Sequence, residues 1–169
     1  AYITHNNGTS LATIDENNNF VDLGTFVDSG GTALTRVYGL AFGKDGEIYL
    51  TQINGGSNEK ANGNDTQIWK ANLPAVDGKI TLTKIGTGLG LHRNIAIDTH
   101  AMDIGPDGSM YILDLSGNIF TVDLSTGLAS FVAETVVDGA TEDAQISDAM
   151  DIVFDANFTL YAEGTHPSG

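Results

Sequence analysis

Cysteine is absent from the sequence, and basic residues are few. Without cysteine the chain has no disulfide bond, thiol nucleophile or thiolate metal site. Only 7 lysines and arginines stand against 22 aspartates and glutamates, and the resulting formal charge of −15 repels phosphate backbones and anionic membrane surfaces. No apolar run approaches the roughly 18 residues that a membrane-spanning helix needs. We therefore expect no nucleic-acid partner and no insertion into a membrane.

Proline is also scarce, with 3 residues, whereas glycine is abundant, with 21. The hydrophobic fraction of 41% is ordinary for a folded domain. The first residues, AYITHNNGTS, have neither the basic nor the apolar segment of a secretory signal, and they lack an initiator methionine. These features predict a single domain over residues 1–169, a mature or excised piece, located outside the cell or on its surface.

A strand-turn-strand pattern occurs three times along the chain. Apolar residues recur at a spacing of two in short runs bounded by Gly, Asn and Asp, which is typical of strands and tight turns. Three windows align without gaps: Tyr38–Tyr49 (YGLAFGKDGEIY), His100–Tyr111 (HAMDIGPDGSMY) and Met150–Tyr161 (MDIVFDANFTLY). Asp-Gly supplies the turn in the first two windows, whereas the third has Asn157-Phe158 there. Each window therefore predicts a β-hairpin, and the third departs most from the pattern.

Two further strands follow each of the first two windows. These are QIWKANLPAVDGKITLTKIG and GNIFTVDLSTGLASFVAET, and the second resembles SLATIDENNNFVDLGTF near the chain start. The repeat is therefore four strands long, and residues 1–30 supply the third and fourth strands of an incomplete repeat. Ala1–Thr4 offers an alternative, because AYIT resembles IYLT of the first window and makes the opening repeat three strands long. The chain ends on the first two strands of another repeat.

These windows resemble the blades of β-propellers of the broad NHL and gluconolactonase-like kind. In those proteins a phrase such as GLAF-x-x-DG-x-IY spans the two innermost strands of a blade. The resemblance covers almost the whole chain and implies an all-β fold of four-stranded antiparallel blades, about three per chain. It reports how blades pack and not which chemistry they carry.

About three blades do not close a ring, because closed propellers have roughly four to eight. Three ways of completing the ring remain open. The chain is part of a longer propeller, or two chains form a six-bladed ring, or chains pair head to tail by exchanging strands through their incomplete blades. Under the last two, the partner is the chain itself, as a homo-oligomer.

The resemblance also places a ligand site at the mouth of the central channel, on the loops that enter each innermost strand. Asp103 stands where the other windows have Ala41 and Val153, and a buried unpaired charge is costly there. It therefore faces the channel or has a partner such as His100. The predicted ligand-binding residues are Arg36, Tyr38, Asp98, His100, Asp103 and Asp148.

Carboxylates are dense just before the third window. Their oxygens are the ligands that Ca²⁺ prefers, so the segment predicts a calcium site, with an acidic surface loop as the alternative. The sequence has no EF-hand pattern, D-x-[DN]-x-[DN]-G. The predicted metal ligands are Asp138, Glu142, Asp143, Asp148 and Asp151.

Other polar features carry less chemistry. The four histidines show no metal-binding spacing, and no G-x-S-x-G nucleophile elbow is present. Trp69 occupies the position of Phe120 in the repeat, which predicts packing in the core. The polar loop over residues 54–66 is either a binding loop or a tolerated insertion.

These observations favour a non-catalytic, secreted or cell-surface β-propeller module that binds a ligand or its own copies. A glycan and a peptide both remain as ligands, and Ca²⁺ is predicted to order the acidic loops. The alternative is part of a metal-dependent gluconolactonase-like hydrolase, which requires the carboxylates at the channel mouth to converge on one ion. No catalytic residue is predicted.

Overall fold

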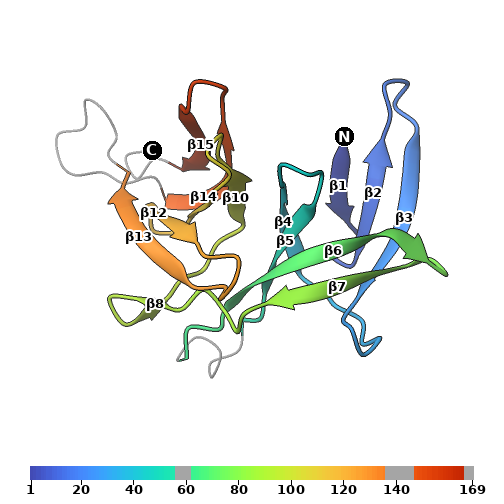
Figure 1. Ribbon diagram of the computed structural model, residues 1–169, viewed down its shortest axis with the longest axis horizontal. Coiled ribbons are helices and arrows are strands. Elements are labelled where there is room, and N and C mark those ends of the chain that lie inside the picture. Colours follow the sequence, from blue (N-terminus) through green and yellow to red (C-terminus); the bar gives the residue numbers. More distant parts are fainter. Residues whose placement is uncertain (56–61, 136–146, 166–169) are drawn as a thin grey trace.

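The computed structural model describes residues 1–55, 62–135 and 147–165 (Figure 1). Strands make up all the regular secondary structure in these ranges. The same ranges hold no helix that is long and apolar enough to cross a membrane. The all-β class predicted from the sequence is confirmed.

The first half of the chain forms one seven-stranded sheet in the order β1-β2-β3-β7-β6-β5-β4. Consecutive strands β4 to β7 pair antiparallel, so they make the four-stranded unit expected of a blade. Strands β1 to β3 form a second antiparallel group of three. The strands are β1 (Tyr2–His5), β2 (Ser10–Ile14), β3 (Phe20–Val27), β4 (Val37–Phe42), β5 (Ile48–Ile53), β6 (Thr66–Val76) and β7 (Lys79–Ile85).

The second half forms a four-stranded antiparallel sheet, β10-β11-β12-β13, and a hairpin, β14–β15. A short hairpin, β8–β9, precedes β10 in the chain. Figure 1 shows β1–β3 at the right and β10–β15 at the left, with β4 and β5 between them. The strands are β8 (Leu91–His92), β9 (Ile95–Ala96), β10 (Ala101–Ile104), β11 (Met110–Leu113), β12 (Asn118–Val122), β13 (Ala129–Glu134), β14 (Ser147–Phe154) and β15 (Leu160–Thr165).

All three predicted hairpins are present, as β4–β5, β10–β11 and β14–β15. Gly46 and Gly108 take positive φ values of 79° and 85° at the first two turns, a conformation that glycine adopts without strain. Phe158 takes φ 67° at the third turn, where a bulky residue is strained. At the chain start the structure adopts the alternative with an additional strand, because β1 makes the opening group three strands long.

Alternate side chains of each strand pack against different neighbouring sheets. On β5, Leu50 joins a buried cluster with Phe26 of β3. The next residue along the pleat, Tyr49, joins a cluster with Met110 of β11. On β11, Leu113 belongs to a third cluster that includes Ile152 of β14. Because side chains alternate across a strand, the β4–β7 and β10–β13 groups are each covered by one neighbour on each face.

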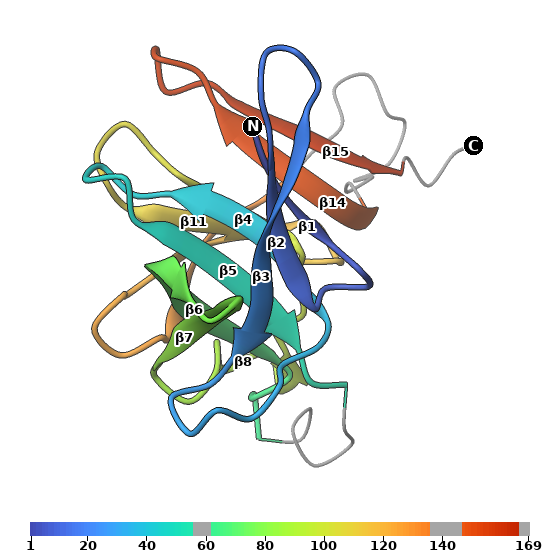
Figure 2. The same ribbon diagram turned by 90° about the vertical axis from the view of Figure 1, so that its right-hand side faces the viewer.

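Parallel pairing between β3 and β7 joins the first two groups of strands, and the repeat pattern did not predict it. The β2–β3 register shifts between Leu11 and Ala12, so β3 turns away from β2 there. Gly24 follows with φ 136°, and a Cβ there would clash with the carbonyl of Gly78. Beyond this bulge, Phe26 lies opposite Ile80 of β7. Figure 2 views the molecule from the side of β1–β3.

Aspartates close many of the turns between strands. Asp155 Oδ1, for example, accepts the backbone N–H groups of Asn157 and Thr159 at 2.9 and 2.8 Å. Such bonds mimic a backbone turn and compensate its free N–H groups. Hydrogen bonds from residues two or four positions later hold the pKa below its usual value in a set of these carboxyl groups, namely Asp15, Asp107, Asp123 and Asp155. Part of the strong acidity of the chain therefore has a structural role.

The turn aspartates predict a loss of stability in acid. A carboxyl group whose pKa is depressed by folding stabilises the native state above its unfolded pKa of about 3.9, and this contribution disappears as the pH falls through the lower folded value. We expect the melting temperature to change little between about pH 7 and pH 5 and to fall below about pH 4. Asp155→Asn should show a smaller acid-induced drop than the wild type, measured by thermal unfolding with circular dichroism.

Asp45→Asn is the matched control. Asp45 is exposed and accepts no side-chain hydrogen bond from the described part of the chain, so this substitution should leave the acid profile unchanged. Identical profiles for Asp155→Asn and the wild type would show that the turn bonds do not set the acid response.

The seam between β3 and β7 predicts a large effect of truncating Phe26. This side chain is 0% exposed, so Phe26→Ala should lower the free energy of unfolding by about 3–5 kcal/mol. Phe42→Ala removes the same atoms from a ring that is 46% exposed, and it should cost less than about 1.5 kcal/mol. Urea unfolding measures both values, and equal losses would mean that Phe26 is not a core residue.

Candidate functional site

The loops that enter the inner strands gather at one end of the molecule. The antiparallel registers place Val37, at the start of β4, opposite Gln52, and Ala101, at the start of β10, opposite Leu113. The β5–β6 and β11–β12 connections therefore lie at the same end as the segments that lead into β4 and β10. Strands β4 and β10 are neighbours, so these segments come together. We call this end of the molecule the loop end.

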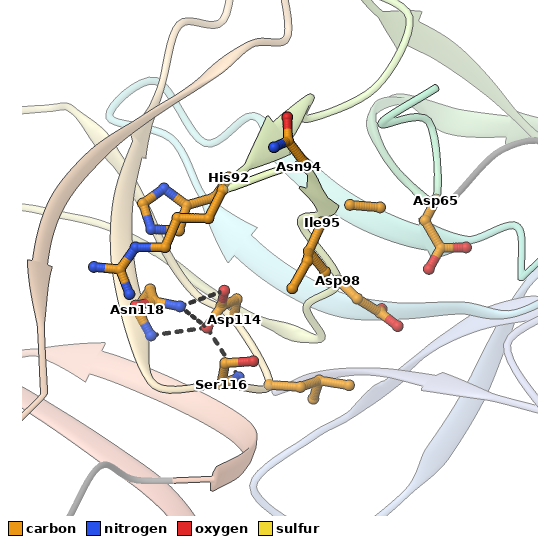
Figure 3. A pocket seen from close by; sticks show the side chains of 11 residues that line it. Asp65, His92, Asn94, Ile95, Asp98, Asp114, Ser116 and Asn118 are labelled. Atoms are coloured by element: carbon orange, nitrogen blue, oxygen red, sulfur yellow. Dashed lines mark hydrogen bonds between the residues drawn. The ribbon is translucent and has the colours of Figure 1, made fainter. Parts of the chain in front are cut away.

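A cavity of about 630 Å³ opens at the loop end (Figure 3). Its walls come from the residue before β6, the β8–β9 hairpin, the segment before β10 and the β11–β12 turn. Segments far apart in the sequence thus contribute to one space. The lining residues are Asp65, His92, Arg93, Asn94, Ile95, Ala96, Asp98, Asp114, Leu115, Ser116 and Asn118.

The β8–β9 hairpin forms one wall of this cavity. Its two turn residues, Arg93 and Asn94, have φ values of 50° and 65°, the pair of positive angles that a two-residue hairpin turn requires. Arg93 donates to Glu134 of β13, which fixes the hairpin to the neighbouring sheet. The His92 ring stacks on Phe131 of β13 with centroids 4.8 Å apart. The hairpin therefore has a defined position, and Ile95, the first residue after its turn, is 71% exposed.

Three aspartates line the cavity, and each is held by bonds to its surroundings. Asp65 is 1% exposed, and its Oδ1 accepts the backbone N–H of Gly55 at 2.9 Å. Asp98 Oδ1 lies 3.4 Å from the hydroxyl of Thr66, which donates to it. Asp114 accepts bonds from the backbone and side chain of Asn118, drawn as dashed lines in Figure 3. The carboxylates thus occupy fixed positions around the cavity.

Of the ligand-binding residues predicted from the sequence, Asp98 lines the cavity, and Tyr38 and His100 lie together at the loop end. The rings of Tyr38 and His100 have centroids 5.0 Å apart. Arg36 lies beside the β5–β6 connection, where its Nη1 donates to the carbonyl of Asn54 at 3.3 Å. The structure therefore brings Tyr38 and His100 together, while Arg36 contacts a different loop.

Asp103 takes a partner in the next sheet. Its Oδ2 accepts the backbone N–H of Phe154 at 2.8 Å, which ties β10 to β14. Its Oδ1 accepts the N–H of Ile104 at 2.8 Å. His100, the partner suggested from the sequence, donates neither of these hydrogen bonds. Asp148 lies in β14, and its side chain is outside the described part of the structure.

The predicted calcium ligands fall mostly outside the described residues. These are Asp138, Glu142 and Asp143, together with the side chain of Asp148. Asp151 is described and lies opposite Glu163 in the β14–β15 hairpin. Burial, followed by the negative charges of Asp103 and Glu163, raises the pKa of Asp151. Over the described ranges, no three or more His, Asp or Glu side chains form a group that could hold a metal ion.

Sequence reasoning missed His92, Asn94 and Asp65 as parts of the site. The sequence around His92 and Asn94 shows only a two-residue turn between short apolar segments, and no metal-binding spacing. Asp65 lies at the end of a polar loop in which nothing distinguishes it from its neighbours. Trp69 packs in the core as predicted, at 7% exposed, and its indole N–H donates to Gln52 at 3.0 Å. The middle of the loop over residues 54–66 lies outside the described residues, although Asp65 at its end reaches the cavity.

Solved structures of similar fold come from β-propeller proteins. A gluconolactonase from Xanthomonas campestris is 16% identical, with a TM-score of 0.51 over 92% of this chain and 41% of that protein. A second protein, provisionally named a gluconolactonase, is 11% identical, with a TM-score of 0.53 over 93% of this chain and 43% of that protein. The chain thus spans less than half of the length of either. No protein-family model and no curated protein matches the sequence.

At these identities the likeness concerns the fold alone. The chain has the β-propeller fold, built from mainly antiparallel sheets that pack face to face, and the resemblance noted from the repeated windows is confirmed at that level.

The close approach of β4 and β10 predicts that Gly39 is required at the loop end. A Cβ on Gly39 would clash with the carbonyl of His100, so Gly39→Ala should push the two inner strands apart. We expect a loss of about 1–3 kcal/mol in the free energy of unfolding and a changed NMR signal for the His100 ring, which contacts Tyr38.

Gly30→Ala provides the comparison for Gly39→Ala. The nearest atom to a Cβ at Gly30 is Asp28 Oδ1 at 3.3 Å, in an exposed turn. This variant should unfold within about 0.5 kcal/mol of the wild type. If Gly39→Ala were as stable as the wild type, β4 and β10 would not be in contact at this position.

Proposed function

We propose that this chain is a non-catalytic β-propeller module that binds a small polyhydroxylated ligand, such as a sugar unit of a glycan, in the cavity at the loop end. The observation that carries the proposal is the convergence of polar side chains from four connections on one cavity of about 630 Å³. Ligand pockets in proteins have volumes of about 300–1,000 Å³, so the cavity has the size of a small-molecule site.

The chemistry of the lining supports a ligand rich in hydroxyl groups. A hydroxyl both donates and accepts, and the cavity offers the carboxylate of Asp98 as an acceptor, together with the side-chain amide of Asn94. Leu115 and Ile95 add apolar surface, which suits the C–H faces of a sugar ring. The formal charge of −15 disfavours an anionic ligand by comparison.

The location outside the cell or on its surface is part of this proposal, and its support is compositional. Acidic surfaces favour solubility, and a sheet protein without cysteine does not depend on disulfide bonds. Calcium enters the proposal through the acidic segment before β14. Among its predicted ligands, Asp151 is the one whose side chain is described. Burial raises its pKa, and the nearby charges of Asp103 and Glu163, which a cation would neutralise, raise it further.

A second candidate is part of a metal-dependent hydrolase of sugar lactones. It is supported by the similarity in fold to two proteins named as gluconolactonases. His100 beside Tyr38 at the loop end is the group that could act as a general base in such a reaction. Turnover separates the two candidates, because the binding module leaves a lactone intact whereas the hydrolase opens it to the acid.

The first experiment is a titration of the chain with neutral monosaccharides, sugar lactones and oligosaccharides, followed by NMR and calorimetry. We expect binding that shifts the signals of residues 92–98 and 114–118 and no lactone hydrolysis above the buffer rate. Addition of Ca²⁺ and then a chelator tests for the metal in the same samples. Failure of every neutral polyol to bind at millimolar concentration would overturn the proposal, and chelator-sensitive hydrolysis would favour the second candidate.

Asn94→Gly tests the cavity wall directly. Glycine tolerates the φ of 65° at this position, so the variant removes the amide without straining the turn. Loss of one or two hydrogen bonds to the ligand should weaken binding about fivefold to tenfold. The matched control is Asn18→Gly, at another exposed asparagine with φ 61° outside the cavity, and its affinity should equal that of the wild type.

A further inference from the structure

The β8–β9 hairpin projects from two buried anchors. Leu89 and Ile97, which flank it in the chain, are 0% and 2% exposed and belong to the cluster between the β4–β7 and β10–β13 sheets. The Ile97 N–H donates to the carbonyl of Gly90 at 3.2 Å and closes the base of the hairpin. Beyond this bond, β8 and β9 pair with each other and with no other described strand. We call residues 91–96 the arm.

An ion pair and an aromatic stack hold the arm against the β10–β13 sheet. Arg93 donates to Glu134 of β13, and the two side chains are 68% and 36% exposed. The His92 ring stacks on Phe131 and lies edge to face with Phe120, with centroids 4.8 and 5.2 Å apart. An ion pair in this exposed position contributes little to stability, because water screens both charges. The arm is therefore docked by weak contacts.

Docking of the arm also has a cost. The Nε2 atom of His92 is buried and forms no hydrogen bond with the described part of the chain. Burial of an unpaired polar atom opposes docking, because water would satisfy the atom if the ring moved away. The apolar side chains of Leu91 and Ile95 add little contact, since they are 46% and 71% exposed. These terms favour a small difference in free energy between a docked and an undocked arm.

The arm is a wall of the cavity at the loop end. All of residues 92–96 line the cavity, whereas the remaining lining residues belong to the connections of the larger sheets. Asn94 lies on the arm, and Asp98 and Ser116 lie on those connections (Figure 3). A ligand that bonds to Asn94 and Asp98 together reaches both only when the arm is docked. Such a ligand binds the docked state more tightly and shifts the arm toward it.

We propose that the arm is a movable wall, which undocks to admit the ligand and docks over it. Arg93 on Glu134 and His92 on Phe131 form its latch, and Gly90, with φ 95° at its base, is the pivot. Glu134 does not line the cavity and acts through Arg93, so it is a positioning residue for the site. The use of the motion for ligand entry rests on the function proposed above, whereas the motion itself is a property of the free chain.

The test is NMR relaxation dispersion on the 169-residue chain without ligand, because this method detects the microsecond-to-millisecond motions of lids. We expect exchange at residues 91–96 and at the rings of His92 and Phe131, and none in β11. Glu134→Gln removes the ion pair at an exposed position and should raise the undocked population about twofold to fivefold. An arm without exchange in both the wild type and Glu134→Gln overturns the proposal.

Glu47→Gln is the matched control. Glu47 forms an ion pair with Lys70 that is also partly exposed and lies outside the cavity, so its loss should leave the exchange of the arm unchanged. Raising the salt concentration from about 0.05 M to about 0.5 M should increase the undocked population of the wild type and not that of Glu134→Gln, because screening weakens an ion pair that the variant lacks. An equal response to salt in both proteins overturns the assignment of the latch.

Saturation with the neutral monosaccharides of the titration above tests whether the motion serves binding. We expect the exchange of the arm to disappear in the complex, and the sugar to dissociate about twofold to fivefold faster from Glu134→Gln than from the wild type. Exchange that continues unchanged in the complex overturns the role of the arm in binding. If no sugar binds, the proposed function fails, and the free chain still decides whether the arm moves. A rigid arm in a chain that binds sugar overturns the movable wall alone.

Discussion

Packing of alternate side chains between successive sheets is the interaction on which the rest of the structure depends. Leu50 and Tyr49, adjacent on β5, are buried against β3 on one side and β11 on the other. Burial of one such side chain contributes about 1.5–3 kcal/mol, and an isolated two-stranded hairpin such as β14–β15 is at best marginally stable in water. The hairpin therefore depends on its packing against the β10–β13 sheet. Val153 and Tyr161, on the β14–β15 hairpin, are 54% and 56% exposed, because no other described strand packs on that face.

The position of the cavity follows from this packing. Strands β4 and β10 lie side by side. The segments that lead into them therefore lie at the same end of the molecule as the β5–β6 and β11–β12 connections. The sheets supply a rigid base, and the β8–β9 hairpin and the β11–β12 turn supply the polar groups. This division between scaffold and loops is common in proteins that bind small molecules, since loop residues can change without loss of the core. It also explains why fold similarity does not identify the ligand.

The acidity of the chain has two consequences that act at different distances. At short range, turn aspartates such as Asp15 and Asp155 accept backbone N–H groups, and their charge strengthens these bonds. At long range, the net charge of −15 opposes the approach of anions and of a second copy. Salt screens this repulsion beyond a Debye length of about 8–10 Å. The local bonds are retained because solvent screens the distant charges more effectively than the adjacent ones.

The sequence by itself determined the local elements. Alternating apolar residues and Asp-Gly turns specified the hairpins at residues 38–49 and 100–111, because side-chain alternation and turn conformation depend on residues a few positions apart. Trp69 in the core followed from its alignment with Phe120. Only the tertiary structure decided the parallel pairing of β3 with β7, the bond from Asp103 to Phe154 and the cavity that joins Asp65 to the β8–β9 hairpin. Those contacts connect residues tens of positions apart, and no local pattern encodes which distant strands or loops will meet.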